Sequence, residues 1–127
     1  NSAKILQVYN SDNYENGYIN MCRTTCALAF VTGSDIRLKK DVNNTAYNAL
    51  EVINAIPIVD YKYCTGNGEC ITGMIAQDVQ KVYPVAVVDG EYLGLSQTEL
   101  IPMYHKAIQE LSTKIDCLEN CITLLTK

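Results

Sequence analysis

An apolar repeat near the C-terminal end constrains the fold of this chain more than any other feature. Its members step by three and four residues without a gap, and they are Ile108, Leu111, Ile115, Leu118, Ile122 and Leu125. This spacing places the side chains on one face of a helix, at the a and d positions of almost three heptads. Ser96 and Glu99 precede the repeat as Ser-x-x-Glu and predict a capping box at the helix start. Pro102 lies close enough to that start to be tolerated.

Two kinds of partner can cover such a stripe. It can pack on a domain of its own chain, or on the same stripe of other copies. Little sequence remains beyond Leu111 to cover it, which favours a seam between chains. In simple parallel peptides, Ile at a with Leu at d favours a two-stranded coil.

The composition is that of one compact domain, or of a small domain with an appended element. The chain has 127 residues, of which 48% are hydrophobic and 19% charged, so we expect a packed core rather than disorder. The net charge is -4 and the basic cluster Arg37, Lys39 and Lys40 is small, which argues against nucleic-acid binding. No apolar run approaches the roughly 18 to 20 residues of a membrane span, and no signal peptide opens the chain, so we expect no membrane partner.

Residues 1–33 have the pattern of a β-rich segment. Short apolar runs at 4–9, 18–22 and 27–31 are separated by Asn, Asp, Ser and Gly, and each predicts a strand. The segment carries few charges and is too small to bury a core alone. It suits the end of a β stalk in which each of several chains supplies part of the core.

The middle of the chain alternates between helical and strand patterns. We expect a helix over 41–55, strands over 58–63 and 70–75 joined by Gly66-Asn67-Gly68, a helix over 76–83 stopped by Pro84, and a second hairpin over 85–95. The Asp89-Gly90 turn of that second hairpin is expected to supply positive φ angles. The predicted fold class is α+β: a stalk segment at 1–33, a small helix and hairpin domain at 34–95, and an oligomerisation helix at 96–127.

The cysteines fall into three close pairs, Cys22/Cys26, Cys64/Cys70 and Cys117/Cys121. Their spacings do not match paired zinc knuckles, so we expect no metal. The simplest interpretation is free thiols, mostly buried, in a protein made in a reducing cytoplasm. A zinc-stabilised binding module is kept as a third class of function.

One segment combines a nucleophile with a base, Gly33-Ser34-Asp35-Ile36-Arg37-Leu38-Lys39-Lys40. A serine becomes nucleophilic beside a base, and a lysine serves as that base when its surroundings favour the neutral amine. The positive charges of Arg37 and Lys40 act in that direction on Lys39. In an extended chain the α-carbons of Ser34 and Lys39 would lie roughly 17 Å apart. The segment must therefore fold back, or two chains must assemble the dyad.

Four blocks, in this order, resemble the peptidase S74 family. They are Ser34-Asp35-x-Arg37-x-Lys39, then Ala49 to Ile53, then Gly73 to Gln80 with Pro84, then Leu100-Ile101-Pro102 with Ala107 to Leu111. The family comprises intramolecular chaperone domains that end phage tail spikes, tail fibres and neck appendages, with relatives in endosialidases and a membrane-tethered myelin transcription factor. The resemblance runs from Ser34 to the C-terminus, and a neck appendage protein is the kind of parent that it suggests.

The resemblance implies a homotrimer that guides folding of its own N-terminal stalk and then releases itself. Ser34 would be the nucleophile, Lys39 the general base and the Ser34–Asp35 bond the cleavage site, without any cofactor. Arg37 and Gln77 would support the site; Gln77 is expected more simply to bond buried backbone. The implied location is the host cytoplasm during virion assembly, with the parent in the virion tail or neck appendage.

The carbonyl that the serine would attack stays open. A serine that attacks its own carbonyl closes a four-membered ring, whereas attack on the Gly33 carbonyl closes a five-membered ring. Either the serine of another protomer therefore acts, or Gly33 provides the acyl group. The only histidine, His105, is expected at the surface or an interface. The main alternative function is a non-catalytic trimerisation module of a fibrous protein.

Overall fold

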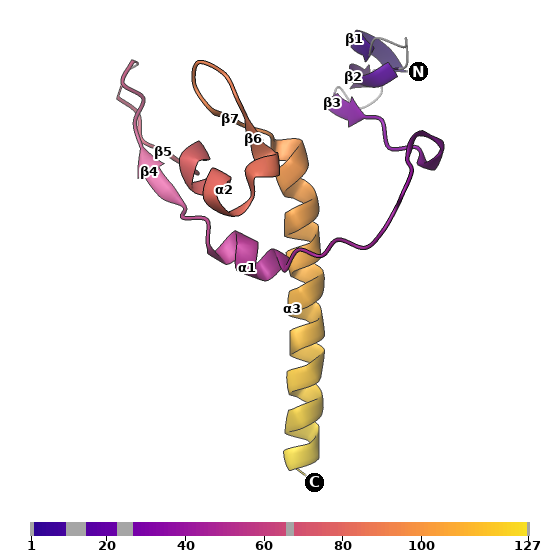
Figure 1. Ribbon diagram of the computed structural model, residues 1–127, viewed down its shortest axis with the longest axis vertical. Helices are drawn as coiled ribbons and strands as arrows, with labels where there is room; N and C mark the ends of the chain where they lie inside the picture. Colours follow the sequence, from indigo (N-terminus) through magenta and orange to yellow (C-terminus); the bar gives the residue numbers. More distant parts are fainter. Residues whose placement is uncertain (1, 10–14, 23–26, 66–67, 127) are drawn as a thin grey trace. The chain divides into compact units, whose positions relative to one another are not determined.

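The computed structural model describes residues 2–9, 15–22, 27–65 and 68–126. They form a mixed α+β fold with three small antiparallel sheets and a long C-terminal helix, as the sequence predicts (Figure 1). The chain divides into two compact units, residues 1–44 and 45–127, which are described one at a time.

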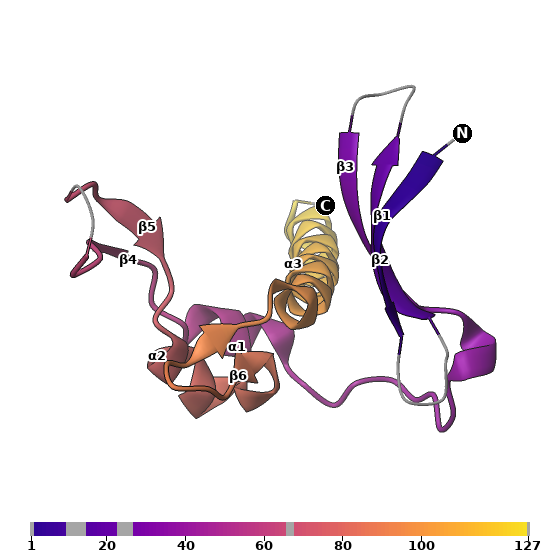
Figure 2. The ribbon, with the colours of Figure 1, turned by 90° about the horizontal axis from the view of Figure 1, so that it is seen from above.

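The first unit is a three-stranded antiparallel meander. Strands β1 (Ser2–Tyr9), β2 (Glu15–Cys22) and β3 (Ala27–Thr32) lie in sequence order, and they confirm the predicted strands (Figure 2). The ladder between β2 and β3 is regular from Gly17 opposite Thr32 to Cys22 opposite Ala27. Apolar side chains remain outside on this sheet, with Phe30 78% and Leu6 53% exposed. At Phe30 and Leu6, a single copy of the sheet therefore leaves apolar side chains uncovered.

The chain leaves the sheet through a 3₁₀ turn, η1 (Ile36–Leu38), followed by residues 39–48 without helix or strand. The helix expected over 41–55 is shorter, because α1 runs only from Ala49 to Asn54. Asn48 caps it by accepting the backbone N–H of Glu51 at 3.3 Å. Asp41 has a positive φ of 53°, and Val42 is 64% exposed. Val42 thus finds no core to pack on, and a short helix without packing is unstable.

The core of the second unit forms where α1, helix α2 (Ala76–Val82) and the 3₁₀ turn η2 (Pro84–Ala86) meet the first half of α3 (Gln97–Leu125) (Figure 2). The α2 helix confirms the prediction that Pro84 ends it. The buried side chains are Ala49, Ile56, Val79, Tyr83, Ala86, Leu100, Met103 and Ala107. Tyr47 closes the edge of this core, with its ring 5.2 Å from that of Tyr83 in an edge-to-face contact.

Two hairpins project from this core. Strand β4 (Val59–Tyr61) pairs with β5 (Ile71–Gly73), and β6 (Val87–Val88) pairs with β7 (Gly94–Leu95), so both predicted hairpins are confirmed with shorter strands. Among the described residues, positive φ angles occur at Asp41 and Gly68. The positive φ predicted at Asp89-Gly90 is therefore wrong. The loop of the second hairpin spans 89–93, and a loop of that length needs no tight two-residue turn.

Helix α3 begins after Ser96, as predicted, but the predicted capping box is absent. The Ser96 side chain makes no bond to the helix backbone, and its Oγ lies 3.3 Å from the hydroxyl of Thr98. The neighbouring hydroxyl thus takes the place of the backbone N–H as partner. Within the described residues, none of the helices combines the length and hydrophobicity that a bilayer crossing requires.

Candidate functional site

Ser34 lies exposed between the end of β3 and the turn η1, and the next residue is firmly held by that turn. The Asp35 carboxylate accepts the Arg37 backbone N–H at 2.8 Å, the Nε–H at 3.0 Å and the Nη2–H at 2.7 Å. The guanidinium, followed by the backbone N–H, lowers the pKa of Asp35, and the same side-chain bond raises the pKa of Arg37. The residue after the predicted cut is therefore fixed by a local ion pair.

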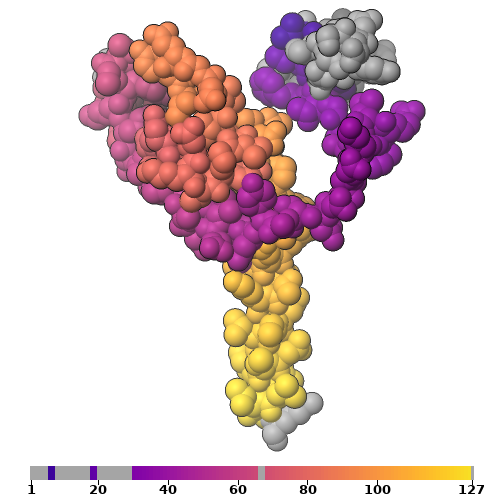
Figure 3. Space-filling model, viewed as in Figure 1, coloured from indigo at the N-terminus to yellow at the C-terminus, as the bar shows by residue number. Residues whose placement is uncertain are grey.

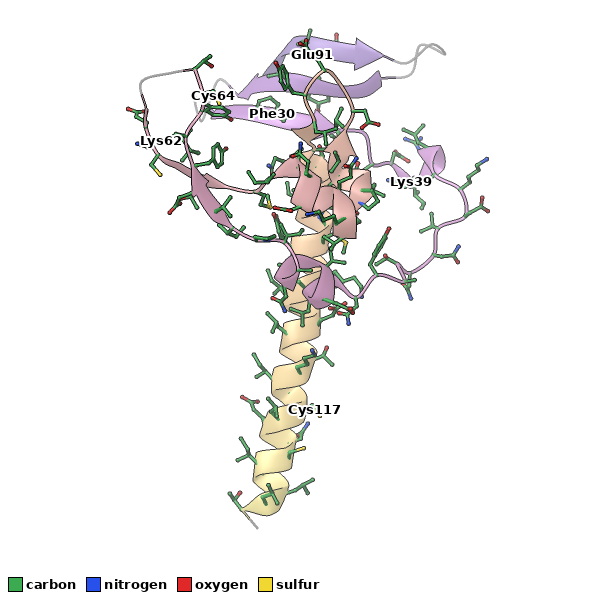
Figure 4. The ribbon with its side chains drawn as sticks, turned by 60° about the vertical axis from the view of Figure 1, so that its left-hand side comes forward. Phe30, Lys39, Lys62, Cys64, Glu91 and Cys117 are labelled. Carbon is green, nitrogen blue, oxygen red and sulfur yellow. The ribbon has the colours of Figure 1, made fainter. Side chains whose placement is uncertain are left out.

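Lys39 ends the turn η1, and its backbone N–H donates to the Ile36 carbonyl at 3.1 Å. Its side chain is exposed and projects away from the backbone (Figure 4). In the described part of the chain no hydrogen bond joins the Lys39 amine to Ser34. The turn joins Asp35 to Arg37 directly after Ser34, but one copy does not form a bonded Ser34–Lys39 dyad.

Arg37 and Gln77 differ in their surroundings. Arg37 is 85% exposed at its side chain and is paired with Asp35 at 2.7 Å, so any support that it lends to the site acts through Asp35. Gln77, in the first turn of α2, is exposed, and the interpretation of a buried amide bonded to backbone is wrong. His105 is exposed on α3, as expected.

A contact that the sequence analysis missed joins α3 to α1. Glu110 Oε1 accepts the Ala49 N–H at 3.1 Å, and Oε2 accepts the Leu50 N–H at 2.9 Å. Lys106 Nζ lies 3.0 Å from Oε1. The Leu50 N–H is the largest of the interactions that lower the pKa of Glu110 to about 2. Both Glu110 and the Ala49 region belong to blocks that carry the family resemblance, but the spacing of the blocks gives no hint that they touch.

The predicted apolar repeat forms an exposed face along α3. Leu100, Met103 and Ala107 are buried against the domain, whereas the repeat points elsewhere. We call the repeat together with Ile101 the seam face; its side chains are exposed as follows: Ile101 61%, Ile108 66%, Leu111 47%, Ile115 53%, Leu118 62%, Ile122 60% and Leu125 86%. Figure 3 shows the second half of α3 extending beyond the rest of its unit. The domain of the same unit therefore does not cover the seam face.

The cysteines do not behave as buried thiols. Cys64, Cys70, Cys117 and Cys121 are free and exposed, because they lie on a projecting hairpin and on the far half of α3 (Figure 4). The prediction of mostly buried thiols is thus wrong for these four; Cys26 and the side chain of Cys22 lie outside the described residues. Among the described His, Cys, Asp and Glu residues, no group of three or more is placed to hold a metal ion.

Comparison with known proteins agrees with the resemblance stated above. Residues 34–88 match the family model of peptidase S74, described as the chaperone of endosialidase. A comparison with curated proteins finds no match. The matched segment starts at Ser34 and includes η1, α1, the first hairpin, α2 and β6. The family implies an intramolecular chaperone that acts on its own fibre protein, with a name that points to self-cleaving peptidase activity. Residues 34–88 of this chain are thus similar to the peptidase S74 family.

Proposed function

We propose that this chain is an intramolecular chaperone that trimerises through α3, assists folding of a triple-stranded β stalk and then releases itself by cleavage at Ser34. The proposal is supported by the presence of two features in the same chain, a family match and an uncovered apolar helix face. The family match begins at a potential nucleophile, Ser34, and α3 presents a seam face with no cover from its own unit. The partners are two further copies of the chain and the stalk that precedes Ser34.

The seam face has the chemistry of a parallel, in-register assembly. With Ile108 and Ile115 at a positions, Lys114 falls at g and Glu119 at the following e, the pair that forms ion pairs between neighbouring parallel helices. Burying aliphatic side chains that are 47% to 86% exposed in one copy stabilises such an assembly. The Ile and Leu pattern alone favours two strands, and the family resemblance favours three.

In the proposed reaction, Ser34 Oγ adds to a backbone carbonyl carbon while the neutral Lys39 amine accepts the hydroxyl proton. The C–N bond then breaks, the proton passes to the leaving nitrogen, and water hydrolyses the ester that remains. Two carbonyls fit this chemistry. One is that of Gly33 in the same chain, through a five-membered ring, and the other is that of Ser34 in a neighbouring copy.

Assembly is the proposed trigger. In a single copy Lys39 is exposed and not bonded to Ser34, and a hydrated ammonium accepts no proton. Burial of the 34–40 segment between copies would favour the neutral amine and align it with the hydroxyl. The cut would follow stalk folding in the host cytoplasm. The parent protein would then remain in a virion tail or neck appendage without the chaperone part that guided its folding.

The test is the intact mass of the purified chain. Self-cleavage predicts two fragments from the wild-type chain, and one full-length mass from Ser34→Ala and from Lys39→Ala. The matched control is Lys62→Ala, which removes an exposed amine outside the 34–40 segment and should still be cut. A single full-length mass from an assembled wild-type chain would instead support a non-catalytic trimerisation module.

A further inference from the structure

Glu110 makes a bridge between two helices whose sequence positions are some 60 residues apart. Its two carboxylate oxygens accept the backbone N–H groups of Ala49 and Leu50 at 3.1 and 2.9 Å, which are among the N–H groups that a helix cannot satisfy internally. The Lys106 ammonium, 3.0 Å away, balances the carboxylate charge, and the side chains of Lys106 and Glu110 are only 30% and 22% exposed. The start of α1 is therefore held by α3 rather than by its own sequence alone.

The same turn of α3 also belongs to the seam face. Ile108 and Leu111 lie on either side of Glu110 in sequence, and they are 66% and 47% exposed. Glu110 is the sequence neighbour of Leu111, so the side chain that holds the first turn of α1 adjoins the seam face. Any assembly that fixes Ile108 and Leu111 thereby fixes the point at which α1 begins.

That point is also where the reactive segment is attached. Residues 40–48, which we call the tether, join Lys39 to Ala49 and contain no helix or strand. Fully extended, the tether spans at most about 30 Å. The reach of Ser34 and Lys39 is therefore set by the position of Ala49 and by the length of free chain that precedes it.

We propose that Glu110 is a positioning residue for self-cleavage, which anchors the tether beside the seam so that the reactive segments of neighbouring copies meet. This role rests on the proposed function. Without the carboxylate, the first turn of α1 loses the partners of two N–H groups and frays. The free chain before the fixed part of α1 then becomes longer, and its attachment point at Ala49 shifts. Both changes lower the effective concentration of Ser34 and Lys39 relative to one another.

The test compares cleavage rates of assembled full-length chains. Glu110→Gln should still trimerise by sedimentation but cleave slower by about tenfold or more. Glu110→Asp, which keeps the charge, should recover part of the rate. Asp116→Asn is the matched control, because it makes the same acid-to-amide change at an exposed position of α3 away from the seam face, and it should cleave at the wild-type rate.

A second variant separates positioning from stability. Leu100→Ala weakens the core but keeps the Glu110 carboxylate that accepts the Ala49 and Leu50 N–H groups, and at an equal drop in melting temperature it should slow cleavage less than Glu110→Gln does. Equal slowing by the two variants, or wild-type cleavage by an assembled Glu110→Gln chain, would overturn the positioning role alone. A wild-type trimer that never cleaves would overturn self-cleavage and the role together.

Discussion

At the scale of single residues, two carboxylates hold the chain at the two ends of the tether. Asp35 acts before it and Glu110 holds the start of α1 after it. Asp35 binds Arg37 within one turn, over a distance of two residues, and so depends on nothing else in the fold. Glu110 binds α1 across the domain and depends on the packing of α3. Local order beside Ser34 should therefore survive when the domain unfolds, whereas the start of α1 should not.

The Glu110 contacts predict an acid-sensitive contribution to stability. The folded pKa of Glu110 is about 2, below its ordinary value of 4.5, so the contribution is complete above about pH 4.5 and is lost as the pH falls towards 2. The melting temperature of the wild-type chain should fall across this window. The melting temperature of Glu110→Gln should be lower than that of the wild-type chain at neutral pH. It should also fall by less when the pH is lowered.

Thermal melts from pH 2 to 7 measure this difference between the two chains. A constant difference between their melting temperatures over the whole range would contradict the assignment, because it would show that protonation of Glu110 has no consequence for stability.

At the scale of elements, α3 divides into a face that holds the domain together and a face that is available for assembly. Leu100 is 1% exposed, whereas Ile115 is 53% exposed. Leu100→Ala should lower the free energy of unfolding by about 2–5 kcal/mol, because it leaves a cavity in the core. Ile115→Ala should leave the unfolding of dilute monomer unchanged and weaken association.

Urea unfolding at low protein concentration, together with sedimentation at high concentration, separates the two effects. A large loss of monomer stability in Ile115→Ala would contradict the division, since it would mean that the seam face packs on its own chain.

The orientation of the paired helices is open to a charge-swap test. In a parallel seam, Glu119→Lys places two ammonium groups side by side and should weaken association, and adding Lys114→Glu should restore it. Sedimentation of the single and double variants measures both steps. An antiparallel pairing predicts no rescue by the double variant.

The elements themselves were largely predictable from the sequence, because periodicity is a local signal. The three strands, both hairpins, α2 and α3 follow from alternation or from three-and-four spacing. The first part of the predicted 41–55 helix does not form, and its Val42 stays exposed, because a pattern cannot tell which of its apolar residues will find a partner. The Glu110 contact was unpredictable for a similar reason, since nothing local marks two groups that meet only in the fold.

At the scale of the whole molecule, the proposed function makes the candidate site a property of more than one copy. The sequence predicts Ser34 and Lys39 as a dyad that needs either a folded-back segment or two chains, and in the single described chain no bond joins the two side chains. The exposed side chains of Leu6 and Phe30, the exposed seam face and the exposed Lys39 side chain are consistent with surfaces that other copies would cover. Assembly should therefore come before chemistry.

The most direct test is the rate of self-cleavage in a chain that folds but cannot assemble. Ile115→Asp places a carboxylate in the seam and should give a monomer with an intact domain. In intact-mass time courses, the wild-type chain should be cut in proportion to the trimer fraction measured by sedimentation, and the Ile115→Asp monomer should stay full length. A monomer that is cut at the wild-type rate would contradict the coupling of cleavage to assembly.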